Sequence, residues 1–261
     1  MRTSIFRAIS GFLAAVAIGA TAWGALASSA TAAPATAALV AAAPAITAPA
    51  SNPLGKLTAN QIATKAFADF KSASSFHYSG SAKEQGQTFS FALWVTGKGC
   101  TGSMSVSSKG GFVIVLIGTT VWIQPDDKFW ETSGVPADQL SLVHGMWLET
   151  TGTGNNSLYP VFRVFCSQKL IVSGKLPRLI KGKTIKISGH PALQLRTKSG
   201  LESIYVSISA KPEILRISYY GALNFSAYNA RVTLTPPPAS DVITNPGTGG
   251  NARSLLRAVA G

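Results

Sequence analysis

Hydrophobic and polar residues alternate over much of the chain, a period of two that is typical of β-strands with one buried face. The clearest series runs from Lys183 to Leu234, in short segments separated by Gly, Pro and Ser residues that favour turns. Short connections between such segments favour hairpins and antiparallel pairing. We therefore predict a meander with one apolar face over this region, with Val232 and Leu234 in its last strand.

One helix is expected before the first strands. Thr58 and Gln61 have the spacing of a capping box. Apolar residues then recur at helical spacing, which predicts an amphipathic helix from Ala59 to about Ala73. Its apolar stripe is expected to pack into the core.

The period changes to two after this helix. Strands are predicted around residues 76–78, 89–95, 100–106, 112–117, 121–123 and 146–148. The segment 112–117 is apolar at every position, which predicts cover on both of its faces. A loop with a short helix is expected near 126–136 and a second helix over 158–170. This order predicts an α+β fold, with a large curved antiparallel half-barrel sheet of about 10–11 strands packed on two or three helices.

The ends of the chain differ in composition from the predicted domain. Arg2 and Arg7 precede an apolar run that closes with Ala30-Thr31-Ala32, the order of a secretory signal peptide, although an uncleaved membrane anchor has a similar pattern. No cysteine follows this run closely, so we expect an exported, extracytoplasmic protein without a lipid anchor. The expected segments are a signal peptide (1–32), an Ala/Pro-rich linker (33–56), one folded domain (57–242) and a disordered tail (243–261).

Lysine and arginine total 23 against 10 aspartate and glutamate residues, a formal net charge of +13. This excess favours anionic partners, and the export signal makes nucleic acid an unsuitable one. A basic cluster mixed with apolar residues is a candidate contact for an anionic membrane surface, or else an ordinary solvated helix and loop. Its members are Lys169, Lys175, Arg178, Lys181, Lys183 and Lys186.

Two cysteines, Cys100 and Cys166, lie in the predicted domain. An even count in an exported chain favours one disulfide rather than a zinc site, because no histidine pair has matching spacing. His77, His144 and His190 fall in different predicted elements, and the carboxylates mostly stand alone. With no nucleophile, phosphate-binding or metalloprotease motif in the sequence, we expect a protein that is not an enzyme, with no metal or cofactor.

Several short stretches, taken in order, resemble actinobacterial lipoproteins of the LppX/LprG type, which have a LolA/LolB-like fold. The resemblance covers roughly residues 57–242, and the lipobox cysteine of that family is absent. It implies a curved half-barrel around a cavity for acyl chains of lipids or lipoglycans, in a non-enzymatic carrier of the cell envelope. The stretches are 75–80, 121–123 with 129–130, 145–147, 189–193, 204–206 with 212–215, and 225–228.

Lipid or glycolipid carriage by a monomer is therefore the expected function. The alternative is an envelope protein-interaction or sensor module, in which exposed Trp94, Trp122 and Trp130 would anchor a partner. The same apolar residues would line a cavity or fill an ordinary core, and the sequence leaves both open. The candidate lining residues are Phe67, Phe70, Phe89, Phe91, Leu93, Met104, Ile114, Leu116, Val206, Leu215 and Ile217.

Overall fold

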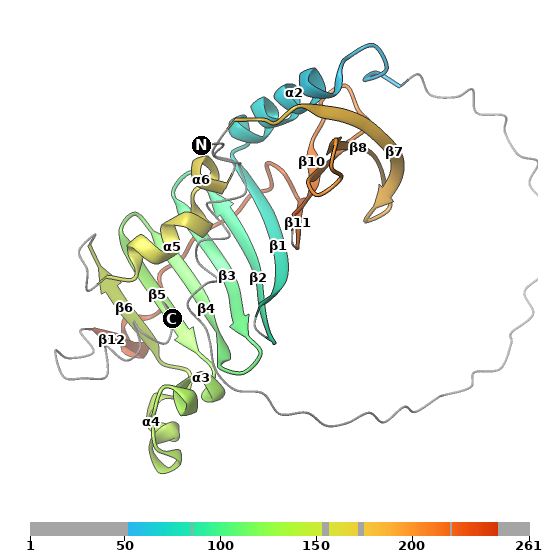
Figure 1. The fold of residues 1–261 in the computed structure, drawn as a ribbon. Helices are drawn as coiled ribbons and strands as arrows, with labels where there is room; N and C mark the ends of the chain where they lie inside the picture. The colour runs from blue at the N-terminus through green and yellow to red at the C-terminus, as the bar shows by residue number, and fades with distance from the viewer. Residues whose placement is uncertain (1–51, 85, 153–156, 172–174, 220, 245–261) are drawn as a thin grey trace, which may run out of the picture.

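The computed structural model describes residues 52–84, 86–152, 157–171, 175–219 and 221–244 (Figure 1). They form an α+β fold with one curved, unclosed sheet of twelve strands. The strands are β1 (Ser75–Glu84), β2 (Gln87–Thr96), β3 (Gly99–Val106), β4 (Gly110–Ile117), β5 (Thr120–Pro125), β6 (Trp147–Thr151), β7 (Leu179–Ile187), β8 (His190–Thr197), β9 (Ser203–Ser207), β10 (Ile214–Ser218), β11 (Ala222–Ser226) and β12 (Val242–Thr244). The helices are α2 (Ala59–Ser72), α3 (Asp127–Thr132), α4 (Leu140–Val143), α5 (Tyr159–Cys166) and α6 (Gln168–Ile171), with 3₁₀ turns η2 (Ala137–Gln139) and η3 (Ala239–Asp241).

The sheet consists of two meanders joined side by side. Its strand order is β12-β6-β5-β4-β3-β2-β1-β11-β10-β9-β8-β7. Strands β1 to β6 form the first meander and β7 to β11 the second, and the antiparallel pair β1–β11 joins them, with Tyr78 opposite Phe225. The predicted antiparallel sheet is therefore confirmed, with one exception at the edge, where β12 runs parallel to β6.

Two strands were not expected, and one expected strand is absent. Strand β11 has only a weak alternation, and β12 is three residues long, so neither gives a clear period in the sequence. The prediction that Val232 and Leu234 end the meander was wrong, because these residues lie outside the strands and precede three consecutive prolines. Proline has no N–H for a strand ladder, which favours an unpaired chain at this point.

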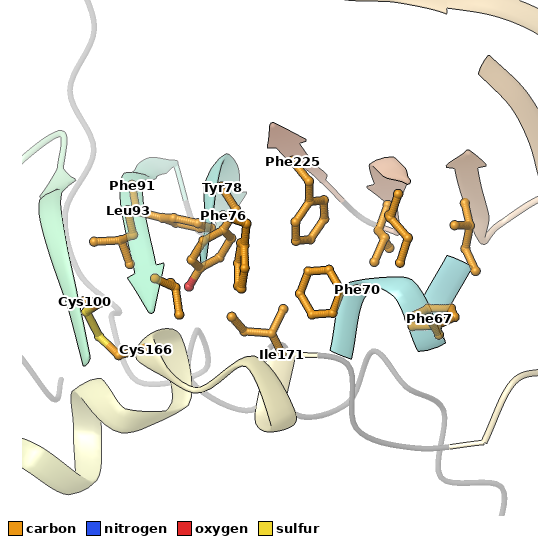
Figure 2. Close-up of a cluster of buried hydrophobic side chains, with 14 of the residues drawn as sticks. Phe67, Phe70, Phe76, Tyr78, Phe91, Leu93, Cys100, Cys166, Ile171 and Phe225 are labelled. Carbon is orange, nitrogen blue, oxygen red and sulfur yellow. A yellow bond between two sulfur atoms is a disulfide. The ribbon is translucent and has the colours of Figure 1, made fainter. Parts of the chain in front are cut away.

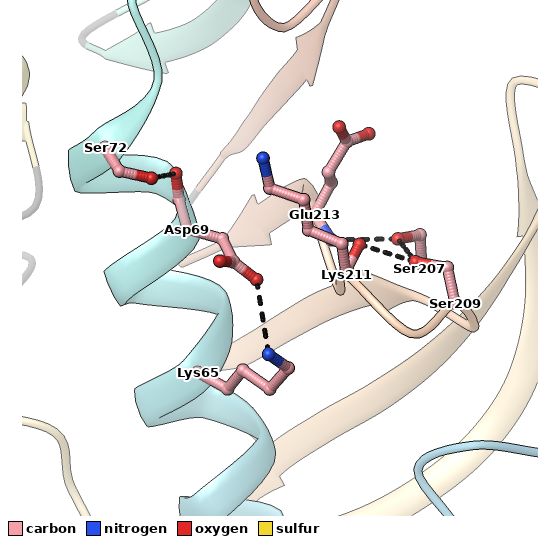
Figure 3. Close-up of polar contacts among 7 residues, drawn as sticks. All are labelled: Lys65, Asp69, Ser72, Ser207, Ser209, Lys211 and Glu213. Carbon is pink, nitrogen blue, oxygen red and sulfur yellow. Dashed lines mark hydrogen bonds and ion pairs between the residues drawn. The ribbon is translucent and has the colours of Figure 1, made fainter.

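The predicted first helix is confirmed as α2. Thr58 Oγ1 accepts a hydrogen bond from the Gln61 backbone N–H at 3.3 Å, and Gln61 Oε1 accepts one from the Thr58 N–H at 2.8 Å. Asn60 in its first turn fixes the start of β7 by accepting from the Leu179 N–H at 3.0 Å. Figure 3 shows α2 beside the turn between β9 and β10, with the Lys65–Asp69 pair at 4.0 Å along the helix.

The concave face of the sheet carries the main core. Side chains from α2 and from most strands meet there, with Phe70, Phe76, Tyr78 and Leu93 almost completely buried. Helix α2 contacts β7, β9 and β10, while α5 contacts β2 and β4 (Figure 1). The disulfide between Cys100 in β3 and Cys166 at the end of α5 confirms the expected pairing and links sheet to helix (Figure 2).

Strand β4 has less cover than its sequence predicted. Ile114 and Leu116 are buried on the concave face, as expected. On the outer face, however, Val113 is 38% exposed, whereas Val115 is buried between Thr101 and Trp122 in the register. Neighbouring side chains on the same face bury Val115 without a covering layer, so the prediction of packing on both faces was wrong.

The domain boundaries were predicted at Leu57 and Val242. Leu54, inside the expected linker, is 1% exposed and packs in the main core, and β12 extends the sheet to Thr244. The expected signal peptide, most of the linker and nearly all of the tail lie outside the described residues. Among the helices described, none has the length and apolar character needed to cross a membrane.

Candidate functional site

A continuous strip of aromatic rings runs along the concave face. It begins at Phe70 of α2, whose ring centroid lies 4.7 Å from that of Phe76. Phe76 is followed by Tyr78 at 5.8 Å, Tyr78 by Phe91 at 5.0 Å, and Phe91 by Phe165 of α5 at 6.0 Å. Figure 2 shows the rings of Phe70, Phe76, Tyr78 and Phe91 between the strands and the helices. These rings are buried and packed against one another in the main core, so an apolar ligand would have to displace side chains to lie along the strip.

Most of the predicted lining residues belong to this face. The structure places ten of the eleven in or against the main core: Phe67, Phe70, Phe89, Phe91, Leu93, Met104, Ile114, Leu116, Val206 and Ile217. Leu215 is the exception, because it packs with Ile187 and Ala192 in a second cluster. A β-bulge between Ile214 and Arg216 shifts the register of β10, so the simple alternation that grouped Leu215 with Ile217 does not hold there.

Short helices cover the strip in its middle. Helices α5 and α6 have eight and four residues, against strands of up to ten residues beneath them. Three phenylalanines near these helices, Phe89, Phe112 and Phe165, remain partly exposed although they pack on the core. They form a partly exposed apolar margin beside the buried strip.

The Tyr78 hydroxyl connects the strip to α5. It donates a hydrogen bond to the Phe165 carbonyl at 2.5 Å, and burial raises the pKa of this phenol well above its ordinary value. The Tyr228 hydroxyl similarly donates to the Ile214 carbonyl at 2.7 Å. Burial, with a smaller contribution from Glu213, raises the pKa of Tyr228. Both phenols therefore stay neutral donors at any ordinary pH.

Two buried polar atoms near α3 have no hydrogen-bond partner among the described residues. They are the Trp130 indole Nε1 and the Ser133 hydroxyl. Trp130 was expected to be exposed, which was wrong: it is 4% exposed, and its ring packs into the core. An unpaired buried donor costs about 1–3 kcal/mol, so a ligand oxygen near the indole would remove an existing penalty.

The basic cluster is exposed, and only half of it lies on the expected helix and loop: Lys169 is on α6, and Lys175 and Arg178 lie between α6 and β7. Lys181, Lys183 and Lys186 lie on β7, a strand at one edge of the sheet. Lysines on an edge strand oppose pairing with another chain. These lysines therefore protect the edge of the sheet, in addition to any contact with an anionic partner. The Lys181 ammonium also donates to the Gly55 carbonyl at 2.9 Å.

A pocket of about 600 Å³ opens at the ends of β3, β4 and β5. Its lining includes Ser103, Val113 and Gln124, which lie on the outer face of the sheet, and the pair His144–Asp127, whose Nδ1 and Oδ1 are 2.8 Å apart. No pattern in the sequence indicates this pocket, because His144 and Asp127 lie 17 residues apart in irregular segments. Among the residues described, no group of three or more His, Cys, Asp and Glu side chains is placed to hold a metal ion.

No protein-family model matches the chain, and neither does any curated protein. Among solved structures, LprF from Mycobacterium bovis matches 69% of this chain and 96% of its own, at 12% identity and a TM-score of 0.47. An uncharacterized conserved protein from Thermus thermophilus matches 71% of this chain and 98% of its own, at 11% identity and a TM-score of 0.34. Both likenesses are distant, and the proposals below are built on the residues of this chain.

Proposed function

We propose that this chain is an exported, non-enzymatic lipid- or glycolipid-binding carrier of the bacterial cell envelope. Acyl chains would lie between the curved sheet and its helices, along the aromatic strip. The observation that supports this most is the partly exposed margin of Phe89, Phe112 and Phe165, which continues the buried strip toward solvent beside short helices.

An acyl chain buried along the apolar strip would gain a large binding free energy. Burial of one methylene stabilises a complex by about 0.8 kcal/mol, so a long acyl chain contributes on the order of 10 kcal/mol before the costs of ordering it. The aromatic side chains present flat apolar surfaces with few rotamers to fix on binding. A chain lying along Phe91 and Phe165 would find apolar contact on both the sheet side and the helix side.

The buried indole of Trp130 would supply a polar contact at one end. Its unpaired Nε1–H is a donor without an acceptor among the described residues. An ester carbonyl or hydroxyl next to an acyl chain would accept from it. Such a contact would orient the lipid, because few other polar groups break the apolar surface.

The disulfide and the basic edge strand fit a location at the envelope. Disulfides persist in exported proteins and are rare in the reducing cytoplasm. The lysines of β7 would favour approach to an anionic membrane surface, from which a lipid is taken or to which it is delivered.

Native mass spectrometry of the protein purified from its own host tests the proposal, followed by solvent extraction of any adduct. We expect a stoichiometric lipid adduct that decreases in Phe165→Asp, where a charge enters the apolar margin. Leu142→Asp is the matched control, because Leu142 is already 74% exposed on α4, and it should retain the adduct. Trp130→Phe should reduce retention while the fold remains. A clean apo mass, unchanged after incubation with host lipids, would overturn the proposal.

A further inference from the structure

The outer face of the same sheet has the composition of a binding site of a different kind. We propose that the outer face of β2–β5, with the pocket at its end, binds a neutral saccharide chain. This site is independent of the lipid proposal, because it lies on the opposite side of the sheet from the aromatic strip.

A row of outer-face residues crosses five strands in register. Trp94 lies opposite Thr101, Thr101 opposite Val115, and Val115 opposite Trp122, which pairs with Glu149. Both indoles are only half-buried. The Trp122 indole N–H donates to Glu149 Oε2 at 2.8 Å, which holds that ring in place. The Trp94 ring lies beside that of His77, with centroids 5.0 Å apart. The row therefore carries two half-buried indoles with Thr101 and Val115 between them.

The spacing of the two indoles suits an extended ligand. Three strand-to-strand steps separate Trp94 from Trp122, which corresponds to about 14 Å at roughly 4.8 Å a step. This distance is longer than one sugar ring. The C–H face of a pyranose packs on an indole, so two indoles at this distance would hold separate rings of one oligosaccharide.

The pocket lies beside this row. The neighbouring outer positions Ser103, Val113 and Gln124 pair with one another across β3, β4 and β5, and all three line the pocket. Gln124 Nε2 donates to the Gly145 carbonyl at 2.7 Å, which brings the loop that carries His144 against the sheet. Hydroxyl, amide and carboxylate groups of the pocket thus lie on the same face of the sheet as the indoles, two positions further along the strands, within reach of one extended ligand.

The charges of the pocket disfavour an anionic ligand. The chain as a whole is strongly basic, yet the pocket lining includes Asp126 and Asp127 and no lysine or arginine among the described residues. Asp126 already accepts from the Gly111 N–H and the Phe129 N–H, both at 2.7 Å, whereas Asp127 is half-exposed beside His144. Carboxylates repel phosphate and sulfate groups but accept hydrogen bonds from sugar hydroxyls. A polyhydroxylated neutral chain therefore fits this surface.

The position on the sheet also indicates the source of the saccharide. A lipid on the concave strip is separated from the outer face by the sheet itself. The ligand is therefore a free or wall-bound polysaccharide and not the head group of the carried lipid.

Titration of the full domain with gluco-, manno- and galacto-configured tetra- to hexasaccharides, measured by tryptophan fluorescence and calorimetry, tests this inference. At least one probe should bind saturably. Trp122→Ala should weaken it roughly tenfold or more, as expected for a central aromatic contact, and Asp127→Asn should weaken it several-fold. Leu201→Ala, 66% exposed on the far meander, is the control and should bind like the parent chain.

Trp122→Phe keeps an aromatic ring and should bind the oligosaccharide better than Trp122→Ala does. This comparison separates loss of the stacking contact from loss of the fold. The inference would be overturned if no probe bound the parent chain, or if the Trp122 and Asp127 variants bound as well as it does. Capture of a protein partner through Trp122, without any saccharide binding, would also overturn it and assign the face to a protein interface.

Discussion

Removal of the disulfide is expected to cost a large part of the stability of the domain. Cys100 in β3 is completely buried, and Cys166 at the end of α5 is 6% exposed. The bridge closes a loop with a sequence separation of 66 residues. On the chain-entropy relation, closing a loop of this length reduces the entropy of the unfolded chain and raises its free energy by about 4 kcal/mol at 25 °C. Typical domains have a free energy of unfolding of about 5–15 kcal/mol, so this loss would be severe.

Urea unfolding of the parent chain and of the double variant Cys100→Ala/Cys166→Ala measures this difference. The midpoint should fall by an amount that corresponds to about 4 kcal/mol. The reduced parent chain should unfold close to the double variant, since both lack the covalent link. The slope with urea should stay similar if the unfolded chains expose similar surface.

A loss below about 1 kcal/mol would refute the reasoning. It would mean that the unfolded chain is compact without the bridge, because the chain-entropy effect acts on the unfolded state. The slope with urea identifies this case, since a compact unfolded chain exposes less surface and gives a lower slope.

Three further outcomes are expected. Thr58→Ala removes the cap of α2 and should lower the free energy of unfolding by about 1 kcal/mol, measured by urea titration, with Thr132→Ala as a comparison. Tyr78→Phe removes the hydrogen bond to the Phe165 carbonyl and should cost about 1 kcal/mol in the same assay; an unchanged midpoint would contradict the buried hydrogen bond. Burial lowers the pKa of His77 below its ordinary value, so the unfolded chain binds more protons just below pH 6.5, and stability should decrease as pH falls through this range. His77→Gln should remove that part of the pH dependence.

Local patterns were sufficient for the elements with a strict period. The capping box at Thr58, the helix behind it and strands β2 and β3 follow directly from spacing, because each buries one regular face. The pairing of two cysteines was also predictable, since the chain has only two. The candidate lining residues, apart from Leu215, were placed on the face of the main core, but they did not include Phe76, Tyr78 and Phe165 of the aromatic strip.

Features that depend on irregular backbone were not predictable. The bulge in β10 moves Leu215 to another cluster, and nothing in the alternation of that strand marks where the extra residue lies. Trp130 was expected at the surface as a partner anchor, but it lies on α3, which Asp126 caps, and its indole packs into the core. The outer pocket depends on contacts between segments far apart in sequence, which a single sequence does not reveal.

The junction between the two meanders forms late during synthesis of the chain. His77 of β1 and Ser226 of β11 lie side by side but 149 residues apart in the chain. At about 5–20 residues a second, the free edge of β1 waits roughly 7–30 s for its partner. During this interval the first meander exposes an unpaired strand and the aromatic side chains that β11 later covers. The nascent chain is therefore most prone to aggregate at β1, and a chaperone or a channel that retains it would protect this edge first.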